Sequence, residues 1–396
     1  MEAVGTVLEG LIGGLFNGIS IGAVLLIVAL GLAIVFGLMG VINLAHGELM
    51  MFGAYTTFVV QNVAKSIGGI APEMYIFAAL PLAFLVAAAI GLFLERTVIR
   101  YLYGRPLETL LATWGVSLIM IQFIRSVSWP IVLGLGIFAA LWLGGQWVWK
   151  RYTDWERIQS TAQPILVGLS AAMAVVASIL IQNLGGTQFV RPWFGARNVD
   201  VTPPSWLRGG VSLGTTLQFP YARLFIIVLT ILCLIAVYWF LNGTAWGLRI
   251  RSVTQNRGMS ACLGIPTNQV DALTFALGSG LAGIAGCAVT LLGSVGPNLG
   301  GNYIVDAFMV VVVGGVGKLV GSIVAALLIG ITTYLIGSGT LAIILPPAEV
   351  FQPAIDFFTF FASTSMAKVM VFALIIAFLQ VRPAGLFPPK GRSVEL

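Results

Sequence analysis

The chain has 396 residues and a formal net charge of +6, with 59% hydrophobic residues, 9% charged residues and a mean hydropathy of +1.02. A water-soluble domain carries about 25% charged residues, so this composition excludes a soluble globular protein. The basic residues fall in short clusters between apolar stretches, as in membrane proteins that follow the positive-inside rule. We therefore expect membrane lipid, and no nucleic acid, around this chain.

Crossing a bilayer takes roughly 20 apolar residues per helix, and the sequence offers stretches of about that length repeatedly. We predict an all-α fold, a polytopic transmembrane helical bundle of roughly 9–11 spans in a single domain over residues 1–396. The apolar stretches lie near residues 11–36, 44–62, 75–94, 108–124, 130–149, 164–182, 221–241, 271–293, 303–317, 319–337 and 368–381.

Loop charges predict the orientation of this multi-pass protein. Counting spans alternately puts four basic clusters on one side, which the positive-inside rule makes cytoplasmic, with the N-terminus outside. The clusters are Arg96, Arg100 and Arg105; Lys150, Arg151 and Arg157; Arg249, Arg251 and Arg257; and Arg382, Lys390 and Arg392. The Pro-rich loop holding Arg191, Arg197 and Arg208 argues against this orientation.

The stretch Val41 to Tyr55, VINLAHGELMMFGAY, places polar groups inside a region otherwise almost free of charge. A carboxylate at membrane depth costs several kcal/mol unless it faces a cavity or a partner, so Glu48 is a candidate functional residue. In a continuous helix Asn43 and His46 would share a face, while Glu48 would point about 200° round. Either the helix breaks near Gly47, or His46 and Glu48 cap a helix start.

A second glycine-interrupted stretch runs from Val305 to Gly321 and contains Asp306 and the cluster Gly314, Gly315 and Gly317. Paired interrupted spans in the two halves of a transporter often mark a site built from broken helices near the membrane midplane. The alternative is that these glycines only let helices approach closely.

The segment 243–266 is basic and amphipathic, and residues Ser252 to Leu263 can form a short helix. Gly264 suits a left-handed helix stop, and Pro266 then ends the segment. Such a helix can lie among lipid headgroups or dock in a groove of a partner protein.

Three patterns in the sequence partly match nucleotide- or metal-binding motifs, but none of them predicts such a site. GSGLAG at Gly278 lies in an apolar span without a preceding strand, which favours close helix packing. The Gly-Lys pair at Lys318 lacks the Ser or Thr of a P-loop. The three cysteines, Cys233, Cys262 and Cys287, show no metal-ligand spacing, so we predict no metal site and no cofactor in this chain.

The Val41 to Tyr55 stretch resembles the hallmark of permease subunits of branched-chain amino acid type ABC importers. Further stretches resemble the family in the same order: TLLATWGVSLI at Thr109, VTQNRGMSACLGI at Val253, DAFMVVVVGGVGKLVGS at Asp306 and VRPAGLFPPKGR at Val381. Within that family GAYTTFVVQN, ATWGVSL and TQNRGMSACLGI are most similar to the urea permease branch.

The resemblance implies a transport permease rather than an enzyme, in the bacterial inner (cytoplasmic) membrane. It implies a second related permease subunit, two ATPase subunits that carry ATP–Mg²⁺, and a periplasmic solute-binding protein as partners. The segment 243–266 would then couple the permease to the ATPase, through Arg251, Gln255, Asn256, Arg257 and Gly264.

One segment departs from the family pattern, since about 65 residues separate Arg125 from Arg191, where the family has a short connection. We predict a two-span helical insertion over residues 126–190. An even number of crossings leaves the downstream topology unchanged.

For the substrate we expect urea, a compact neutral molecule whose pathway needs donors and acceptors at short range and little charge. The spans hold few fixed cations for the carboxylate of an amino acid, although helix N-termini can serve. The residues expected along the pathway are Asn43, His46, Glu48, Tyr55, Thr113 and Asp306. Branched-chain amino acids or short-chain amides are the alternative substrates. A stand-alone urea channel is a further alternative, and we do not expect an intramembrane enzyme because nucleophile–base pairs are missing.

Overall fold

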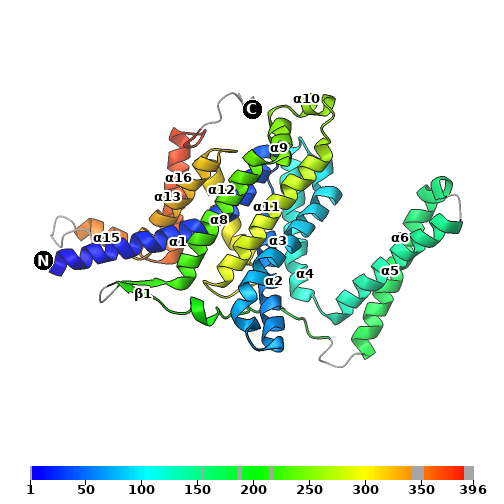
Figure 1. The fold of residues 1–396 in the computed structure, drawn as a ribbon, viewed down its shortest axis with the longest axis horizontal. Helices are drawn as coiled ribbons and strands as arrows, with labels where there is room; N and C mark the ends of the chain where they lie inside the picture. The colour runs from blue at the N-terminus through cyan, green and yellow to red at the C-terminus, as the bar shows by residue number, and fades with distance from the viewer. Residues whose placement is uncertain (1, 153–154, 185–189, 214–216, 341–351, 388–396) are drawn as a thin grey trace. The chain divides into compact units, whose positions relative to one another are not determined.

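The computed structural model describes residues 2–152, 155–184, 190–213, 217–340 and 352–387. Within them the chain forms 14 α-helices and one two-stranded sheet (Figure 1). It divides into two compact units, residues 1–117 with 199–396 and residues 118–198. The polytopic helical fold predicted from the sequence is confirmed.

The larger unit is built around α1 and α11, which pack against each other. Helix α11 also packs on α2 and α3, whereas α1 also packs on α12, α13 and α8. The helices of this unit are α1 (Glu2–Met39), α2 (His46–Ile67), α3 (Ala71–Thr97), α8 (Tyr221–Gly243), α9 (Ala245–Gln255), α10 (Arg257–Cys262), α11 (Thr267–Thr290), α12 (Leu299–Gly314), α13 (Leu319–Gly337), α15 (Gln352–Phe360) and α16 (Thr364–Val381). Helix α4 (Pro106–Ser126) begins in this unit and ends in the other.

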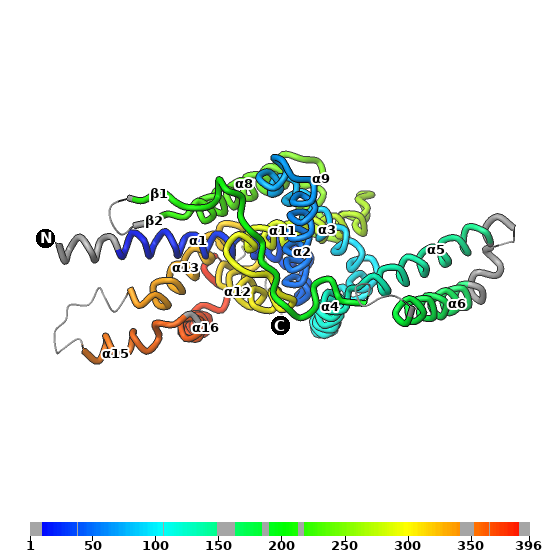
Figure 2. Tube along the Cα trace, turned by 90° about the horizontal axis from the view of Figure 1, so that it is seen from below, coloured from blue at the N-terminus to red at the C-terminus, as the bar shows by residue number. Residues whose placement is uncertain are grey.

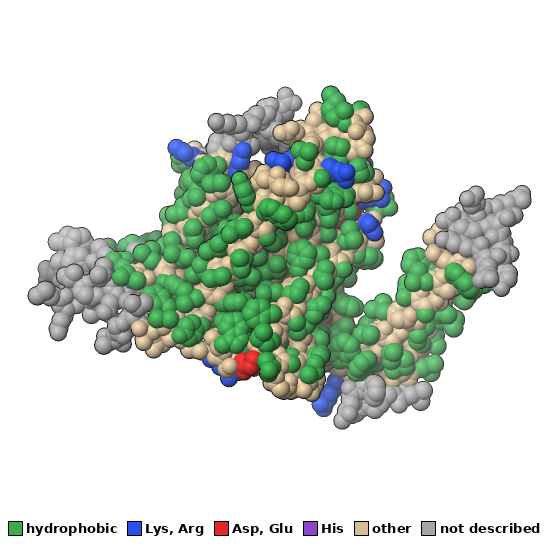
Figure 3. All heavy atoms as spheres, in the orientation of Figure 1, with side chains coloured by type: hydrophobic (Ala, Val, Ile, Leu, Met, Phe, Trp, Pro, Cys, Tyr) green, Lys and Arg blue, Asp and Glu red, His purple; other side chains and the backbone are tan. Residues whose placement is uncertain are grey.

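Eight helices of the described part are long and apolar enough to cross a membrane, or nine if the bent pair α15 and α16 forms one span. The prediction of roughly 9–11 spans also counted the stretches now seen as α2 and α12. Helix α12 has 16 residues and is about 24 Å long, too short to cross alone. Helix α2 is long enough to cross, but it is not apolar enough to count among the eight. Figure 3 shows hydrophobic side chains over most of the visible helical face, with Lys and Arg gathered at its margins, as a membrane protein requires.

Glycine contacts between helix backbones hold this unit together. A Cβ added at Gly53 would lie 2.2 Å from the carbonyl oxygen of Gly283, and one at Gly286 would lie 2.0 Å from that of Met50. Gly278, the first glycine of GSGLAG, meets the backbone of Gly31 in the same way. Close helix packing, the interpretation preferred over nucleotide binding, is what the structure shows for this motif.

The strands β1 (Gly210–Leu213) and β2 (Leu217–Pro220) form an antiparallel ribbon beside α1 (Figure 2). Phe16 and Phe219 meet edge to face with ring centroids 4.5 Å apart. The preceding loop contains the 3₁₀ turn η2 (Ser205–Leu207). It is tied to the start of α3 because the amide and hydroxyl of Ser205 both donate to Glu73, at 2.8 and 2.7 Å.

The smaller unit is a helical hairpin of α5 (Trp129–Tyr152) and α6 (Trp155–Leu184), which pack along each other. The hydroxyl of Ser178 donates to the carbonyl oxygen of Pro130 at 3.1 Å, and the rings of Trp129 and Trp193 meet at 5.0 Å. That this hairpin is an insertion, as residues 126–190 led us to expect, stays a prediction.

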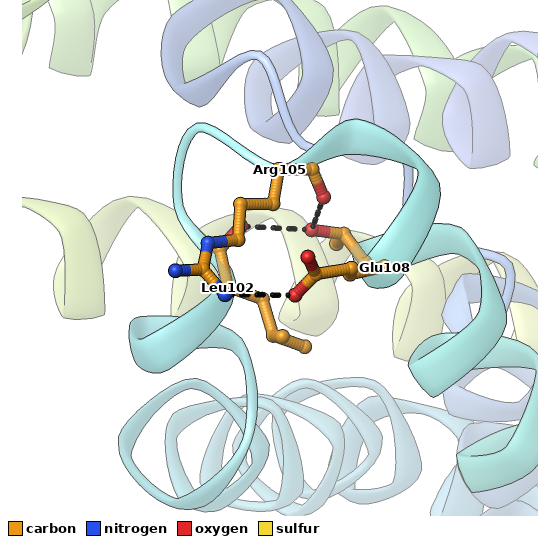
Figure 4. Close-up of polar contacts among 4 residues, drawn as sticks. Leu102, Arg105 and Glu108 are labelled. Carbon is orange, nitrogen blue, oxygen red and sulfur yellow. Dashed lines mark hydrogen bonds and ion pairs between the residues drawn. The ribbon is translucent and has the colours of Figure 1, made fainter.

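A tight turn leads from the 3₁₀ helix η1 (Ile99–Leu102) into α4. Thr109 donates its hydroxyl to the carbonyl oxygens of Leu102 and Arg105, at 3.0 and 2.8 Å (Figure 4). Arg105 and Glu108 form an exposed ion pair at 3.1 Å on the same turn. These contacts fix the direction in which α4 leaves, and α4 carries part of the candidate site.

Candidate functional site

Both glycine-interrupted stretches of the sequence coincide with breaks between helices. Residues 40–45 separate α1 from α2, with Gly40 at φ +66°, and residues 315–318 separate α12 from α13. The two breaks lie together, because a Cβ at Gly37 would be 2.4 Å from the Cα of Gly317. The side-chain amide oxygen of Asn43 accepts from the backbone N–H of Ala45 at 3.0 Å, which supports the first break.

Asn43 and His46 do not share a helix face, because Asn43 precedes α2 and His46 is its first residue. His46 and Glu48 lie in the first turn, as the alternative interpretation required, yet the N-cap is Ala45 and has no side-chain hydrogen bond. A carboxylate in the first turn is favourable there, since the N-terminal end of a helix attracts negative charge.

Glu48 is the centre of a buried polar cluster between α2 and α4. Its side chain is 2% exposed, and the hydroxyl of Ser117 donates to its Oε1 at 3.1 Å. Its Oε2 has no hydrogen-bond partner within the described residues. One turn earlier on α4, the Thr113 hydroxyl accepts from the backbone N–H of Leu44 at 3.2 Å. The cluster therefore offers an open carboxylate oxygen surrounded by neutral groups.

The glycine pair Gly47 and Gly300 brings α12 against this cluster. A Cβ at Gly47 would lie 2.4 Å from the carbonyl oxygen of Gly300, and one at Gly300 would lie 2.8 Å from the carboxyl carbon of Glu48. Asn43 adds a second open group, since its Nδ2 is buried without a partner in the described part of the chain. The structure thus unites three predicted pathway residues, Asn43, Glu48 and Thr113.

His46 lies apart from this cluster, fully buried against α1. Its Nε2 is 3.2 Å from the carbonyl oxygen of Val28, and its ring fills the space beside Gly31. This environment is that of a packed core histidine between two helices. Tyr55, two turns beyond Glu48 on α2, is buried with 2% exposure.

Asp306 lies away from the Glu48 cluster, at the wall of a cavity of about 360 Å³ that is lined by α1, α12, α13 and α16. Its Oδ2 is 2.8 Å from the Nζ of Lys368, a residue that the sequence interpretation missed. Ser117 was missed as well, although it follows Thr113 by four residues and so lies on the same face of α4. Lys368 had no such signal, because it is distant in sequence from every predicted pathway residue.

The segment 243–266 forms two helices instead of the one expected over Ser252 to Leu263. The break falls at Asn256, whose side chain caps α10 by accepting from the backbone N–H of Met259 at 3.0 Å. Gly264 adopts φ +79° directly after the C-cap of α10, which is the left-handed helix stop predicted from the sequence. Met259 and Leu263 are 60% and 75% exposed, so the end of this segment presents apolar side chains outward.

Arg257 is held by other residues of the larger unit. Its guanidinium pairs with Asp271 of α11 and lies over the ring of Tyr103, 5.0 Å from the centroid. Burial raises the pKa of the Tyr103 phenol, which donates to Oε1 of Glu95 at 3.1 Å. Of the other predicted coupling residues, Gln255 is exposed and Arg251 donates to Asn242 at 3.1 Å.

Comparison with known proteins shows the family to which this chain belongs. The family model "Branched-chain amino acid transport system / permease component" matches residues 14–379. The permease protein LivH of the high-affinity branched-chain amino acid transport system is 26% identical over 377 residues in Salmonella typhimurium and 25% identical over 380 residues in Escherichia coli K12. The corresponding protein BraD of Pseudomonas aeruginosa is 24% identical over 373 residues. Each of these matches covers 94% of both chains, and no solved structure matches. This chain is a multi-pass membrane protein that belongs to the branched-chain amino acid transport permease family.

Proposed function

We propose that this chain is the permease subunit of an ATP-driven importer that moves branched-chain amino acids from the periplasm to the cytoplasm. The observation that carries the proposal is the match of nearly the whole chain to permeases named for these substrates. Urea, the substrate expected from the sequence, gains no support from these relatives. The alternative substrate of the sequence analysis therefore becomes the main one.

The partners follow from this function. A second related permease subunit would complete the pathway in the inner membrane. A periplasmic solute-binding protein would deliver the substrate to the two permease subunits. Two ATPase subunits would bind ATP–Mg²⁺. The exposed end of α10, with Met259 and Leu263, offers the apolar knob that a groove on an ATPase subunit can take. Arg257 would transmit movement of the knob, since its contacts tie the knob to Asp271 of α11 and to Tyr103 at the end of η1.

The substrate is tested by uptake of labelled leucine and labelled urea in cells with the intact system and in cells that lack this subunit. Loss of leucine uptake with unchanged urea uptake is the expected result. Loss of urea uptake alone would keep the family and restore the first substrate prediction.

The docking of the knob is tested by Leu263→Asp, which places a charge on the exposed apolar end of the segment. We expect the ATPase subunits to be lost from the purified complex, since a buried unpaired charge is costly at an interface. The matched control is Ile70→Asp in the loop between α2 and α3, an equally exposed apolar residue outside the knob and outside the candidate membrane spans. Equal recovery of ATPase with Leu263→Asp and with wild type would contradict the docking role.

A further inference from the structure

The cavity beside Asp306 combines two opposite charges with aliphatic walls. It has a volume of about 360 Å³ and is formed by four helices of the larger unit. Small-molecule sites in proteins run from about 300 to 1,000 Å³, so this one suits a ligand of amino-acid size. Its aliphatic walls come from α1, α13 and α16 and include Ile21, Leu25, Ile329 and Val371.

The charges in the cavity come from two helices. The ammonium group of Lys368 on α16 lies 2.8 Å from Oδ2 of Asp306 on α12 and 3.5 Å from the carbonyl oxygen of Asn302. The Asp306 side chain is 10% exposed and that of Lys368 is 39% exposed. The lysine is therefore the more accessible partner, and its flexible four-carbon stem can re-aim the ammonium group.

Charges inside a membrane domain are expensive, and those that persist mark substrate or ion pathways by default. A structural link between α12 and α16 does not require them, because an ion pair with a partly exposed partner adds little stability. The charges are therefore better explained by a ligand that uses both of them.

A free amino acid carries an ammonium and a carboxylate on the same carbon. Inserted between the two side chains, it would give Asp306 a cation and Lys368 an anion, and each protein charge would keep an opposite partner. The aliphatic walls would take the side chain of the amino acid. A neutral amide such as urea can hydrogen-bond to both groups but supplies no counter-charge, so breaking the ion pair for it would leave both protein charges without an opposite charge.

We propose that the cavity between α1, α12, α13 and α16 binds a zwitterionic aliphatic amino acid, with Asp306 receiving its ammonium group and Lys368 its carboxylate. The inference rests on the proposed function and deepens it, since it assigns the recognition of both charges of the substrate to this chain.

The test measures thermal unfolding of the purified complex of permease and ATPase subunits, without the solute-binding protein, in the presence of leucine. Two probes carry one charge each, isopentylamine without the carboxylate and 4-methylpentanoate without the ammonium group, and urea carries none. A ligand at free concentration c that binds only the folded state stabilises it by RT ln(1 + c/Kd), so the concentration needed for a fixed rise in melting temperature reports the affinity. For wild type, leucine should give the same fixed shift at a concentration at least tenfold lower than either single-charge probe, and urea should give no shift.

Lys368→Met should raise the leucine concentration needed for that fixed shift at least tenfold and remove the preference for leucine over isopentylamine. Asp306→Asn should do the same for leucine over 4-methylpentanoate. The double variant removes both charges and leaves no unpaired one, so it stays foldable and should lose the response to leucine. Lys65→Met, which removes an exposed lysine at the end of α2, should respond like wild type.

A leucine response that is the same in wild type and in both single variants would overturn the proposed site, as would a wild-type complex without any response. If cells without this subunit lose leucine uptake while the variants respond normally, only this inference fails. If those cells lose urea uptake instead, the proposed function fails as well.

Discussion

Glu48 and Asp306 are both buried carboxylates in a membrane domain, and the structure gives them opposite surroundings. Glu48 has a neutral partner, the hydroxyl of Ser117, and keeps one oxygen open. Asp306 has a cation at 2.8 Å and borders a cavity. A carboxylate with neutral partners can take up a donor without losing a partner, whereas a paired one must exchange its cation. The first arrangement suits a group passed in transit, and the second suits recognition of a charged ligand.

The largest effect is expected where backbone contact supports the Glu48 cluster. Gly300→Ala would place its Cβ 2.5 Å from the backbone of Gly47 and 2.8 Å from the carboxyl carbon of Glu48. Overpacking of this kind should lower the free energy of unfolding by about 3 kcal/mol. Gly301→Ala, the neighbouring residue on α12, meets nothing within 4 Å and should be neutral. Thermal unfolding of the two purified variants gives the comparison, and equal stability would show that α12 does not pack on this cluster as described.

The second-largest effect on stability is expected at the ion pair between Lys368 and Asp306. Lys368→Met should lower the free energy of unfolding by about 2 kcal/mol, because it leaves Asp306 unpaired at a half-open site. Asp306→Asn in the same chain should recover part of that loss, which a double-mutant cycle measures as a coupling free energy. The exposed pair Arg105 and Glu108 is the control, with an expected coupling below about 0.5 kcal/mol. Equal coupling free energies for the Asp306–Lys368 and Arg105–Glu108 pairs would mean that the cavity leaves its two charges as exposed to solvent as a surface pair.

The fold class and most helices followed from composition and hydropathy, because a membrane sets both the length and the apolarity of its spans. The Glu48 cluster was partly predictable, since Asn43 and Glu48 stand out in a charge-free region and Thr113 lies in a recognisable motif. The role of Lys368 was not predictable, because only tertiary packing brings α16 to α12. The same limit applies to Arg257, which the sequence placed in a cytoplasmic basic cluster and which pairs with Asp271 in the structure.

Glu48→Gln tests whether the open carboxylate oxygen is used in transport. The amide oxygen can still accept from Ser117, so the complex should assemble normally. The amide nitrogen then replaces an acceptor by a donor, and the loss of about one charge-assisted hydrogen bond should slow leucine uptake about tenfold. Glu108→Gln makes the same change on an exposed turn and should leave uptake unchanged. Unaltered uptake in Glu48→Gln would remove Glu48 from the pathway and leave the cavity at Asp306 as the single candidate.

Ser117→Ala should have the smallest effect, because it removes one hydrogen bond to Glu48 and keeps the carboxylate. A single bond of this kind contributes about 1 kcal/mol, so uptake should fall by no more than about fivefold. Ser117→Thr retains the hydroxyl and should restore most of the rate. Ser126→Ala on the same helix is the control, since that hydroxyl donates to the carbonyl oxygens of Gln122 and Phe123 in its own helix. If Ser117→Ala slowed uptake as much as Glu48→Gln, the position of the Glu48 carboxylate rather than its charge would limit transport. The Glu48 cluster and the Asp306 cavity would then differ only in how strongly their hydrogen bonds and ion pairs fix each carboxylate.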